Sequence, residues 1–352
     1  MPFDFTMIDE DHCIYVKKSN RNFVILSLYI DDILLAGNNL EYVKTVKSWL
    51  SKSFDMKDMG EADYILGVKI QRDRSKNFLS LFEETYIKKI LERFRMNSCK
   101  LMDTLIARGE TLSLEMCPKT EKEKEDMSRV PYSSVVGSLL YAMMCARPDI
   151  CYAASLVSRY QFNPGRDHWK AVKRIFRYLK GTTDYTLCYS GFDLFIRCYT
   201  YVDWASDRND RKSTSSYAFL LNGGAISWKI KKKTCITLST MESEFVACVS
   251  LVQEIVWSKR FFEHLSIAKD SMGLLILNCD SQAAITYTKD PKYHSKTKHI
   301  DIKYNFVRDV VPSGEITLQY IPTCEMIADP FTKAISRDLF EKHVKALGLR
   351  RV

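Results

Sequence analysis

The longest apolar run of the chain does most to constrain its fold. It covers Phe23–Ile30 and stops at two adjacent carboxylates, Asp31 and Asp32. The run is far shorter than the ~20 apolar residues of a membrane-spanning helix, and its β-branched and aromatic side chains are typical of a strand. With the strand-like segment Cys13–Lys17, it predicts a β-hairpin. Adjacent carboxylates repel each other unless a divalent cation neutralises them, so the end of this strand is a candidate metal site.

Composition and charge narrow the class of protein. The 352 residues, of which 27% are charged and 46% hydrophobic, suit about two folded domains rather than a disordered chain. The formal net charge of +9 suits a polyanionic partner such as nucleic acid. The eleven cysteines form no C-x-x-C pair, and the first residues lack the basic and apolar regions of a signal peptide. We therefore expect an intracellular protein, cytoplasmic or nuclear, that is neither secreted nor embedded in a membrane.

Apolar periodicity predicts how secondary structure is distributed along the first half of the chain. The hairpin is followed by a helix from Asn38, by strands at residues 64–70 and 78–81, and by a helix at 84–94. Between residues 107 and 129 the periodicity stops, and the run EKEKED predicts an exposed linker. Helices are predicted again at residues 132–160 and 166–180.

The second half of the chain alternates predicted strands and helices. The strands fall at residues 196–202, 216–221, 225–229, 234–238, 274–279 and 316–321, and the helices at 241–264 and from 281. This order predicts a mixed β-sheet flanked by helices, and the whole chain is predicted to be an α/β (α+β) protein. Its expected segments are residues 1–105, 106–190, 191–340 and 341–352.

Carboxylates at the ends of these elements are candidates for binding metal. Asp203 ends a strand, Asp280 follows one, Glu242 and Glu244 open the long helix, and Asp329 precedes a helix. Carboxylates that converge from strand and helix ends can hold two divalent cations ~4 Å apart, which is the arrangement that hydrolyses phosphodiesters. Taken singly, each acid is more often a helix cap or a solvated surface charge than a metal ligand, and only their joint placement favours the metal site.

Helical geometry distinguishes the two glutamates. Residues two apart on a helix point about 200° away from each other, so only one of the pair can face the sheet. The row above Glu244 contains Cys248, Leu251 and Ile255, whereas the row above Glu242 ends in polar residues. Glu244 is therefore the predicted ligand.

The helix predicted at residues 166–180 has one apolar and one basic stripe. The basic stripe consists of Lys170, Lys173, Arg174, Arg177 and Lys180. A solvated face and a surface that contacts nucleic-acid phosphates both explain such a stripe, and the sequence leaves both interpretations open.

The chain contains nine segments in a fixed order: LYIDDILLAGNN, MGEADYILGVKIQRDRSKNFLSL, PYSSVVGSLLYAMMCARPDICYA, HWKAVKRIFRYLKGT, DRKSTSSYAFLLNGGAISWKIKKK, LSTMESEF, CDSQAAI, HSKTKHIDIKYNFVRD and ADPFTK. Together they resemble the Pol polyprotein of copia-type long-terminal-repeat retrotransposons over nearly the whole chain. The resemblance implies part of a reverse transcriptase palm and the region after it at residues 1–105. A linker and helical connection, a ribonuclease H-like domain and a tail would make up the remaining three segments.

The resemblance also implies roles for particular residues. Asp31 and Asp32 would bind the polymerase metals, and Glu244, Asp280 and Asp329 would form a ribonuclease H site for two Mg²⁺ or Mn²⁺ ions. The implied partner is an RNA–DNA hybrid or another nucleic acid. Further residues expected near that hybrid, for which a solvated basic turn is an equal explanation, are Lys231, Lys232 and His299.

Two departures from the family pattern change the expected activity. The family's polymerase needs a further palm aspartate and the fingers, and neither precedes Asp31. Polymerisation by this chain alone is therefore expected to be absent. Another chain would have to supply the missing half of the polymerase. In the family the first ribonuclease H strand is Tyr-x-Asp-Ala-Asp-Trp-Ala, whereas here it is YTYVDWA. Tyr201 therefore replaces the first aspartate, and Asp203 keeps the second.

Tyr201 is a degenerate catalytic position because a phenol with a pKa near 10 does not supply an anionic oxygen at neutral pH. Asp203 shares a strand face with it, but about 6.6 Å away, which makes Asp203 a poor substitute. A smaller departure is Glu83, where the family usually has glutamine.

Three hypotheses follow from these departures. The first is a Pol remnant whose ribonuclease H domain folds but cleaves poorly. The second is an active metal-dependent ribonuclease H in which Asp203 serves as a ligand. The third is a non-catalytic module that binds nucleic acid through its basic residues.

Overall fold

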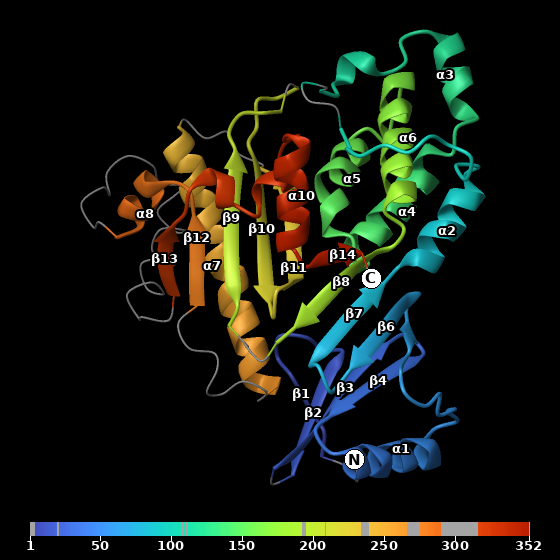
Figure 1. Ribbon diagram of the computed structural model, residues 1–352, viewed down its shortest axis with the longest axis vertical. Helices are drawn as coiled ribbons and strands as arrows, with labels where there is room; N and C mark the ends of the chain where they lie inside the picture. The colour runs from blue at the N-terminus through green and yellow to red at the C-terminus, as the bar shows by residue number, and fades with distance from the viewer. Residues whose placement is uncertain are drawn as a thin grey trace. The chain divides into compact units, whose positions relative to one another are not determined.

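The computed structural model describes residues 4–19, 21–106, 109, 111–191, 195–207, 209–233, 239–265, 275–289 and 316–351. They form two compact units (Figure 1). The first unit holds the residues before Tyr64 together with the second half of a long helix, from Gln253 on, and the second unit holds the others. Among these residues we find no helix that is both long and apolar enough to cross a lipid bilayer.

The first unit is a four-stranded antiparallel sheet. Its strands lie in the order β1 (Thr6–Met7), β2 (Ile14–Ser19), β3 (Asn22–Tyr29) and β4 (Asp32–Gly37). The β2–β3 pair is the hairpin predicted from the apolar run. Helix α1 (Leu40–Ser53), predicted to begin at Asn38, is capped one residue later by Asn39, whose side chain accepts a hydrogen bond from the Tyr42 N–H.

Both faces of this sheet are covered. Val24 and Leu26 of β3 pack against α1. On the other face, Ile25 packs with Phe261 and Leu265 from the last turns of α7 (Thr240–Leu265). The alternation of side chains along β3 thus buries one set of apolar residues on each side.

The second unit contains an antiparallel sheet built from distant parts of the chain. Its order is β14 (Leu349–Arg351), β8 (Tyr185–Ser190), β7 (Phe78–Phe82), β6 (Val68–Asp73) and β5 (Tyr64–Ile65). Leu66 and Gly67, both at positive φ, form the turn that splits the strand predicted at residues 64–70 into β5 and β6. The sheet joins strands from three of the four segments expected from the sequence.

A group of helices packs beside this sheet. They are α2 (Glu84–Arg93), the short η1 (Leu114–Met116), α3 (Glu121–Ser128), α4 (Tyr132–Cys145), η2 (Pro148–Ile150), α5 (Cys151–Ser158) and α6 (Arg166–Gly181). Their shared core includes Ile87 of α2, Leu139 of α4, Val157 of α5 and Phe176 of α6, each fully buried. The apolar stripe predicted on α6 therefore faces this core.

The exposed linker predicted at residues 107–129 contains a helix, because the run EKEKED forms α3, which is exposed except for Met127. Thr120 and Glu123 form a reciprocal capping box at its start, and Lys124 pairs with Glu121 one turn away. Met127 is the one buried residue of α3. Local capping and charge pairing stabilise a helix here that apolar periodicity alone does not reveal.

Arg147 is fully buried and ties the helices to the sheet. Its guanidinium makes two hydrogen bonds to the Asp149 carboxylate, Nε–Oδ1 at 2.9 Å and Nη2–Oδ2 at 2.7 Å, and two more to Thr182. The rings of Tyr178 and Tyr185 lie 5.7 and 5.6 Å from the guanidinium carbon. The motif ARPDI therefore supplies a buried ion pair whose polar atoms are hydrogen-bonded, the condition under which such a pair is tolerated.

The mixed sheet predicted for the second half of the chain is present. Its strands lie in the order β11 (Gly224–Lys232), β10 (Thr214–Leu221), β9 (Arg197–Asp203), β12 (Leu275–Cys279) and β13 (Ile316–Tyr320). β9, β10 and β11 are antiparallel, whereas β12 runs parallel to both β9 and β13. The strand predicted at residues 234–238 lies outside the described residues.

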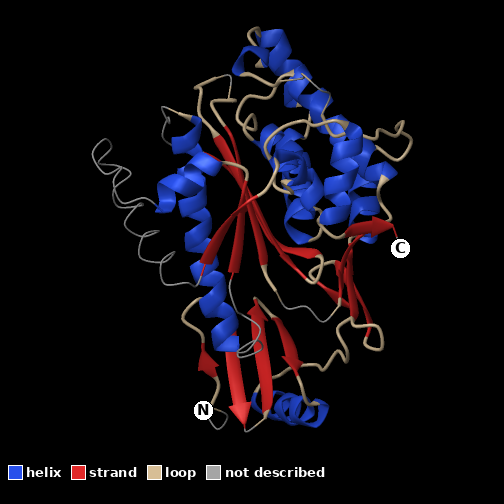
Figure 2. Ribbon diagram, turned by 60° about the vertical axis from the view of Figure 1, so that its left-hand side comes forward, coloured by secondary structure: helices blue, strands red, loops and turns tan. Residues whose placement is uncertain are grey.

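Helices flank this sheet on both faces (Figure 2). The first half of α7 lies against one face and buries Phe245, Cys248 and Leu251, while Phe245 also stacks edge-on with Tyr287 of α8 (Gln282–Lys289). On the other face, residues of α5 and α10 (Arg337–Ala346) pack against Ala218 and other residues of β10 and β11. The short helices η3 (Thr323–Glu325) and η4 (Asp329–Phe331) follow β13.

Glu83 adds a second carboxylate to the surroundings of Arg147. Its side chain is buried, and neither carboxylate oxygen has a hydrogen-bond partner among the described residues. Burial raises the pKa of Glu83 from 4.5 to about 8, against the opposing effect of Arg147. The side chain is therefore protonated at neutral pH, when it is uncharged and close in shape to the glutamine that the family pattern has there.

We expect Glu83→Gln to stabilise the protein in a pH-dependent way. Below the unfolded-state pKa of 4.5, Glu83 is protonated in the folded and the unfolded protein, so its contribution to stability does not change with pH. Between pH 4.5 and about 8, Glu83 ionises only in the unfolded protein, so the free energy of unfolding falls as pH rises. At pH 7 this ionisation lowers the free energy of unfolding of the wild type by about 3 kcal/mol relative to pH 4.5. Urea unfolding from pH 4.5 to 8 should show the variant becoming more stable than the wild type as pH increases.

The exposed Glu92→Gln change in the last turn of α2 serves as the control for loss of one carboxylate. Parallel pH profiles of the wild type and Glu83→Gln would contradict this account of Glu83.

Candidate metal centre

The parallel pairing of β9 and β12 brings the ends of these strands to one edge of the mixed sheet. Asn278 of β12 lies opposite Tyr199 of β9. Continuing this register by two residues places Asp280 beside Tyr201, with Asp203 one further pair along. Carboxyl ends of parallel strands therefore collect three of the candidate positions at this edge.

Glu244 approaches the same edge from the first turns of α7. It is buried, whereas Glu242 is half-exposed, as the helical spacing predicts. The backbone N–H of Val202 donates to the Glu244 carboxylate, while its Oε2 is buried with no hydrogen-bond partner. Burial, and then the neighbouring Cys279 and Asp280, raise the pKa of Glu244 to about 9.

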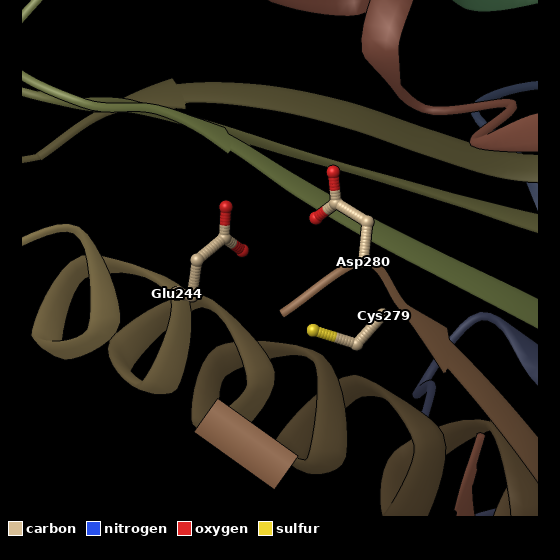
Figure 3. A group of neighbouring side chains, drawn as sticks. All are labelled: Glu244, Cys279 and Asp280. Atoms are coloured by element: carbon tan, nitrogen blue, oxygen red, sulfur yellow. The ribbon is translucent and has the colours of Figure 1, made fainter. Parts of the chain in front are cut away.

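Glu244, Cys279 and Asp280 form a group whose ligand atoms all lie within 4.8 Å of one another. Figure 3 shows the three side chains pointing toward a common space between α7 and the end of β12. Asp280 is held by a hydrogen bond from the Thr323 hydroxyl, 2.8 Å from Oδ2. Two carboxylates and an orphaned buried oxygen fit a divalent cation, which Glu244 and Asp280 would hold.

Asp329 lies in a different environment, next to Tyr201 and Lys333. Lys333 Nζ is 2.7 Å from Asp329 Oδ1, donates to the Tyr201 hydroxyl at 2.7 Å, and lies 4.7 Å from the centre of the Tyr201 ring. Burial raises the pKa of Tyr201 to about 12, so the phenol is neutral at physiological pH. Burial also raises the pKa of Asp329, and its pairing with Lys333 opposes that shift.

This half of the predicted site does not fit a second metal ion. The Lys333 ammonium already neutralises Asp329, and the Tyr201 phenol that accepts from it is uncharged. Asp203 is half-buried nearby, and its pKa is raised by burial despite the Lys333 charge. The five predicted positions thus divide into a pair with room for a cation, Glu244 and Asp280, and three groups arranged around a lysine.

Asp31 and Asp32 lie at the tip of the β3–β4 hairpin in the other unit. Tyr29 pairs with Asp32, and Ile30 has a φ of 53°, an unusual value for a branched residue that the tight two-residue turn requires. Both aspartates are exposed, so water screens their repulsion without a bound cation. Among the described residues, no third metal-ligating side chain groups with this pair.

The basic stripe of α6 is largely engaged within the protein. Arg174 donates to the carbonyl and hydroxyl of Thr104, at 3.1 and 2.7 Å, and Lys180 donates to the carbonyl of Cys99 at 2.8 Å. Lys173 lies over the Trp169 ring. These contacts hold residues 99–104 against the helix and explain the stripe without a nucleic acid.

Two further members of the stripe differ in exposure. Lys170 is exposed and paired with Asp167 at 2.7 Å, and Arg177 is half-buried. A role of these side chains in binding nucleic acid stays a prediction.

The predicted basic residues of the second unit also differ in their surroundings. Lys232 forms ion pairs with Asp207 and Asp210 at 2.8 and 2.7 Å, whereas Lys231, the preceding residue of β11, is exposed. His299 lies outside the described residues.

Cys279 and Lys333 belong to the candidate site but were not predicted from the sequence. Cys279 immediately precedes the predicted ligand Asp280, and Lys333 follows Asp329 by four residues within ADPFTK. A thiol beside a candidate ligand and an Asp-x-x-x-Lys spacing are the signals that could have identified them.

Known proteins are similar to this chain over most of its length. Residues 1–107 match the family model described as reverse transcriptase (RNA-dependent DNA polymerase). The chain is 45% identical over 340 residues to the retrovirus-related Pol polyprotein from transposon TNT 1-94 of Nicotiana tabacum, a match that covers 96% of this chain and 25% of that protein. It is 30% identical over 253 residues to a putative transposon Ty5-1 protein of Saccharomyces cerevisiae, covering 71% of this chain and 80% of that protein.

A solved structure of a foamy viral protease-reverse transcriptase in complex with double-stranded DNA is similar over 85% of this chain and 46% of that one, with 15% identity and a TM-score of 0.44. The chain spans about a quarter of the length of the first curated Pol polyproteins that it matches.

Lys232→Gln is expected to destabilise the second unit, whereas Lys231→Gln leaves its stability unchanged. Lys232 is the ammonium between Asp207 and Asp210, and the Asp207 side chain is only 3% exposed, so removal of the positive charge leaves buried negative charge less compensated. Urea unfolding should show a loss of about 1 kcal/mol for Lys232→Gln. Equal stabilities of the two variants would show that the bridge is not structural.

Proposed function

Because the chain belongs to the Pol polyproteins of copia-type retrotransposons, we propose that its mixed-sheet unit is a ribonuclease H-type module that binds RNA–DNA hybrids and hydrolyses them poorly. The proposal combines the family membership with the metal-ligating group at the edge of the sheet. The position of Lys333 between Tyr201 and Asp329 is the observation that supports weak hydrolysis.

Two-metal hydrolysis of a phosphodiester needs carboxylates on both sides of the scissile phosphate. Glu244 and Asp280 retain the chemistry for one cation, which when bound would polarise a phosphate oxygen. The other side offers a neutral phenol and a carboxylate whose charge is balanced by Lys333. A second cation would have to displace that ammonium, so the two-metal arrangement is the step that this chain performs badly.

The residues around the retained pair position it for a single cation. The Val202 N–H orients Glu244, and the Thr323 hydroxyl orients Asp280. For the hairpin of the first unit, we propose that Asp31 and Asp32 support polymerisation only when another chain supplies the further palm aspartate, because the pair provides two of the three carboxylates of a polymerase metal site.

An active enzyme that uses Asp203 is the second candidate function. The position of Asp203 supports this second function, because Asp203 lies close enough to Asp329 and Lys333 for their charges to affect its pKa. In this arrangement Asp203 would compete with Asp329 for Lys333 and supply the missing negative oxygen. A purely binding module is less favoured, because Arg174 and Lys180 already bind within the protein.

We expect Tyr201→Asp to increase cleavage of the RNA strand of an RNA–DNA hybrid by at least about 100-fold in Mg²⁺ or Mn²⁺. The substitution restores a carboxylate beside Asp280. It also gives the Lys333 ammonium a second carboxylate to pair with, so that Asp329 is less fully neutralised. Single-turnover cleavage of a labelled hybrid measures the rate. Tyr201→Phe, which keeps the ring, should be as slow as the wild type. A wild-type rate comparable to that of Tyr201→Asp would refute the proposal.

Asp203→Asn distinguishes the two candidate functions. If Asp203 is a working ligand, the substitution abolishes both residual cleavage and Mg²⁺ binding. If the impaired site is correct, residual cleavage and cation binding are unchanged, because Glu244 and Asp280 hold the cation. Thermal unfolding of the variant checks that the fold is retained.

A further inference from the structure

We propose that Glu244, Cys279 and Asp280 form a one-sulfur, two-oxygen site that prefers a thiophilic divalent cation such as Zn²⁺ to Mg²⁺. The inference deepens the proposed function at the same edge of the sheet. It concerns which cation the site binds and does not require that the chain hydrolyse a hybrid.

The three ligand atoms come from two elements that the fold holds together. Glu244 projects from α7, while Cys279 is the last residue of β12 and Asp280 follows it. Their ligand atoms lie within 4.8 Å of one another, and Figure 3 shows the Cys279 sulfur directed toward the same space as the two carboxylates. The β12 ladder fixes the backbone of Cys279 through its pairing with Tyr320 of β13.

Two hydrogen-bond donors contact the Cys279 sulfur and hold it in place. The Ser281 N–H donates to Sγ at 3.4 Å, and the Cys248 Sγ lies 3.8 Å away as a further hydrogen-bonding partner. Hydrogen bonds that donate to a sulfur anion stabilise it as a metal ligand. Cys248 itself is fully buried one turn along α7 and is not part of the group of three.

The Glu244 side chain independently points to a missing ligand. It is 8% exposed, and its Oε2 is buried without a hydrogen-bond partner. The nearby ammonium of Lys233 donates to the Ser250 hydroxyl at 3.4 Å. A buried carboxylate oxygen that faces a thiol and a second carboxylate carries a high desolvation cost, which a bound cation removes.

The chemistry of the three ligands selects the cation. Mg²⁺ prefers six oxygen ligands in octahedral geometry, and a sulfur ligand is poorly matched to it. Zn²⁺ accepts sulfur and oxygen together in a four-coordinate site and leaves the fourth position to water. The Lys333 ammonium already pairs with the neighbouring Asp329 carboxylate, so we expect one cation per chain at this site.

The test is a titration of the full chain, kept reduced by a phosphine, with Cd²⁺ as a spectroscopic substitute for Zn²⁺. Thiolate-to-cadmium charge transfer gives an ultraviolet band that reports sulfur ligation. We expect Cys279→Ser to remove the contribution of one site and to weaken Zn²⁺ binding, measured by competition with a chelating dye, by at least about tenfold. Cys13→Ser removes an exposed thiol of the other unit and should leave both readouts unchanged.

A second variant guards against misfolding as an explanation. Glu244→Gln keeps the size and shape of the side chain and removes its negative charge, so it should fold like the wild type and still lose Zn²⁺ affinity. Unaltered Cd²⁺ spectra in Cys279→Ser, or displacement of Zn²⁺ by an equal concentration of Mg²⁺, would overturn the inference. If Cys279→Ser loses the metal while Tyr201→Asp fails to cleave hybrid, the metal site stands and the proposed hydrolytic function fails.

Discussion

The requirement that every buried charge be neutralised organises this protein. Arg147 has no exposed surface, and it is compatible with the core only because Asp149, Thr182 and two tyrosine rings surround its guanidinium. Those partners come from η2, the end of α6 and the start of β8, so satisfying one guanidinium fixes the helices against the antiparallel sheet. Glu83 enters the same core as a neutral acid, which avoids a second uncompensated negative charge at a cost that depends on pH.

The same requirement explains why the two halves of the metal centre differ. At Asp329 the neutralising cation is internal, because Lys333 is one helical turn away and Tyr201 provides a second acceptor for its ammonium. At Glu244 the described residues provide a backbone N–H but leave one carboxylate oxygen without a hydrogen bond. The Asp329 side of the candidate centre is therefore neutralised within the protein, whereas the Glu244 side keeps a buried carboxylate oxygen without a hydrogen bond.

Surface charge follows a related pattern, and it limits what net charge indicates about partners. The excess of nine positive charges suggested a phosphate-binding face, yet Arg174 and Lys180 hold residues 99–104, and Lys232 holds Asp207 and Asp210. Local sequence patterns also have limits. The run EKEKED lacks apolar periodicity, and its helix depends on the capping box at Thr120 that the periodicity does not register.

The sequence by itself determined the local structure and the identity of the family. Apolar alternation placed the β2–β3 hairpin, the strands of the mixed sheet and the inward face of Glu244, because these depend on periods of 2 and 3.6 residues along one segment. Only the tertiary structure decided that Lys333 neutralises Asp329 beside Tyr201, that Cys279 joins Glu244 and Asp280, and that β14 pairs with β8. These outcomes depend on distances between segments far apart in the chain, which spacing within a segment does not encode.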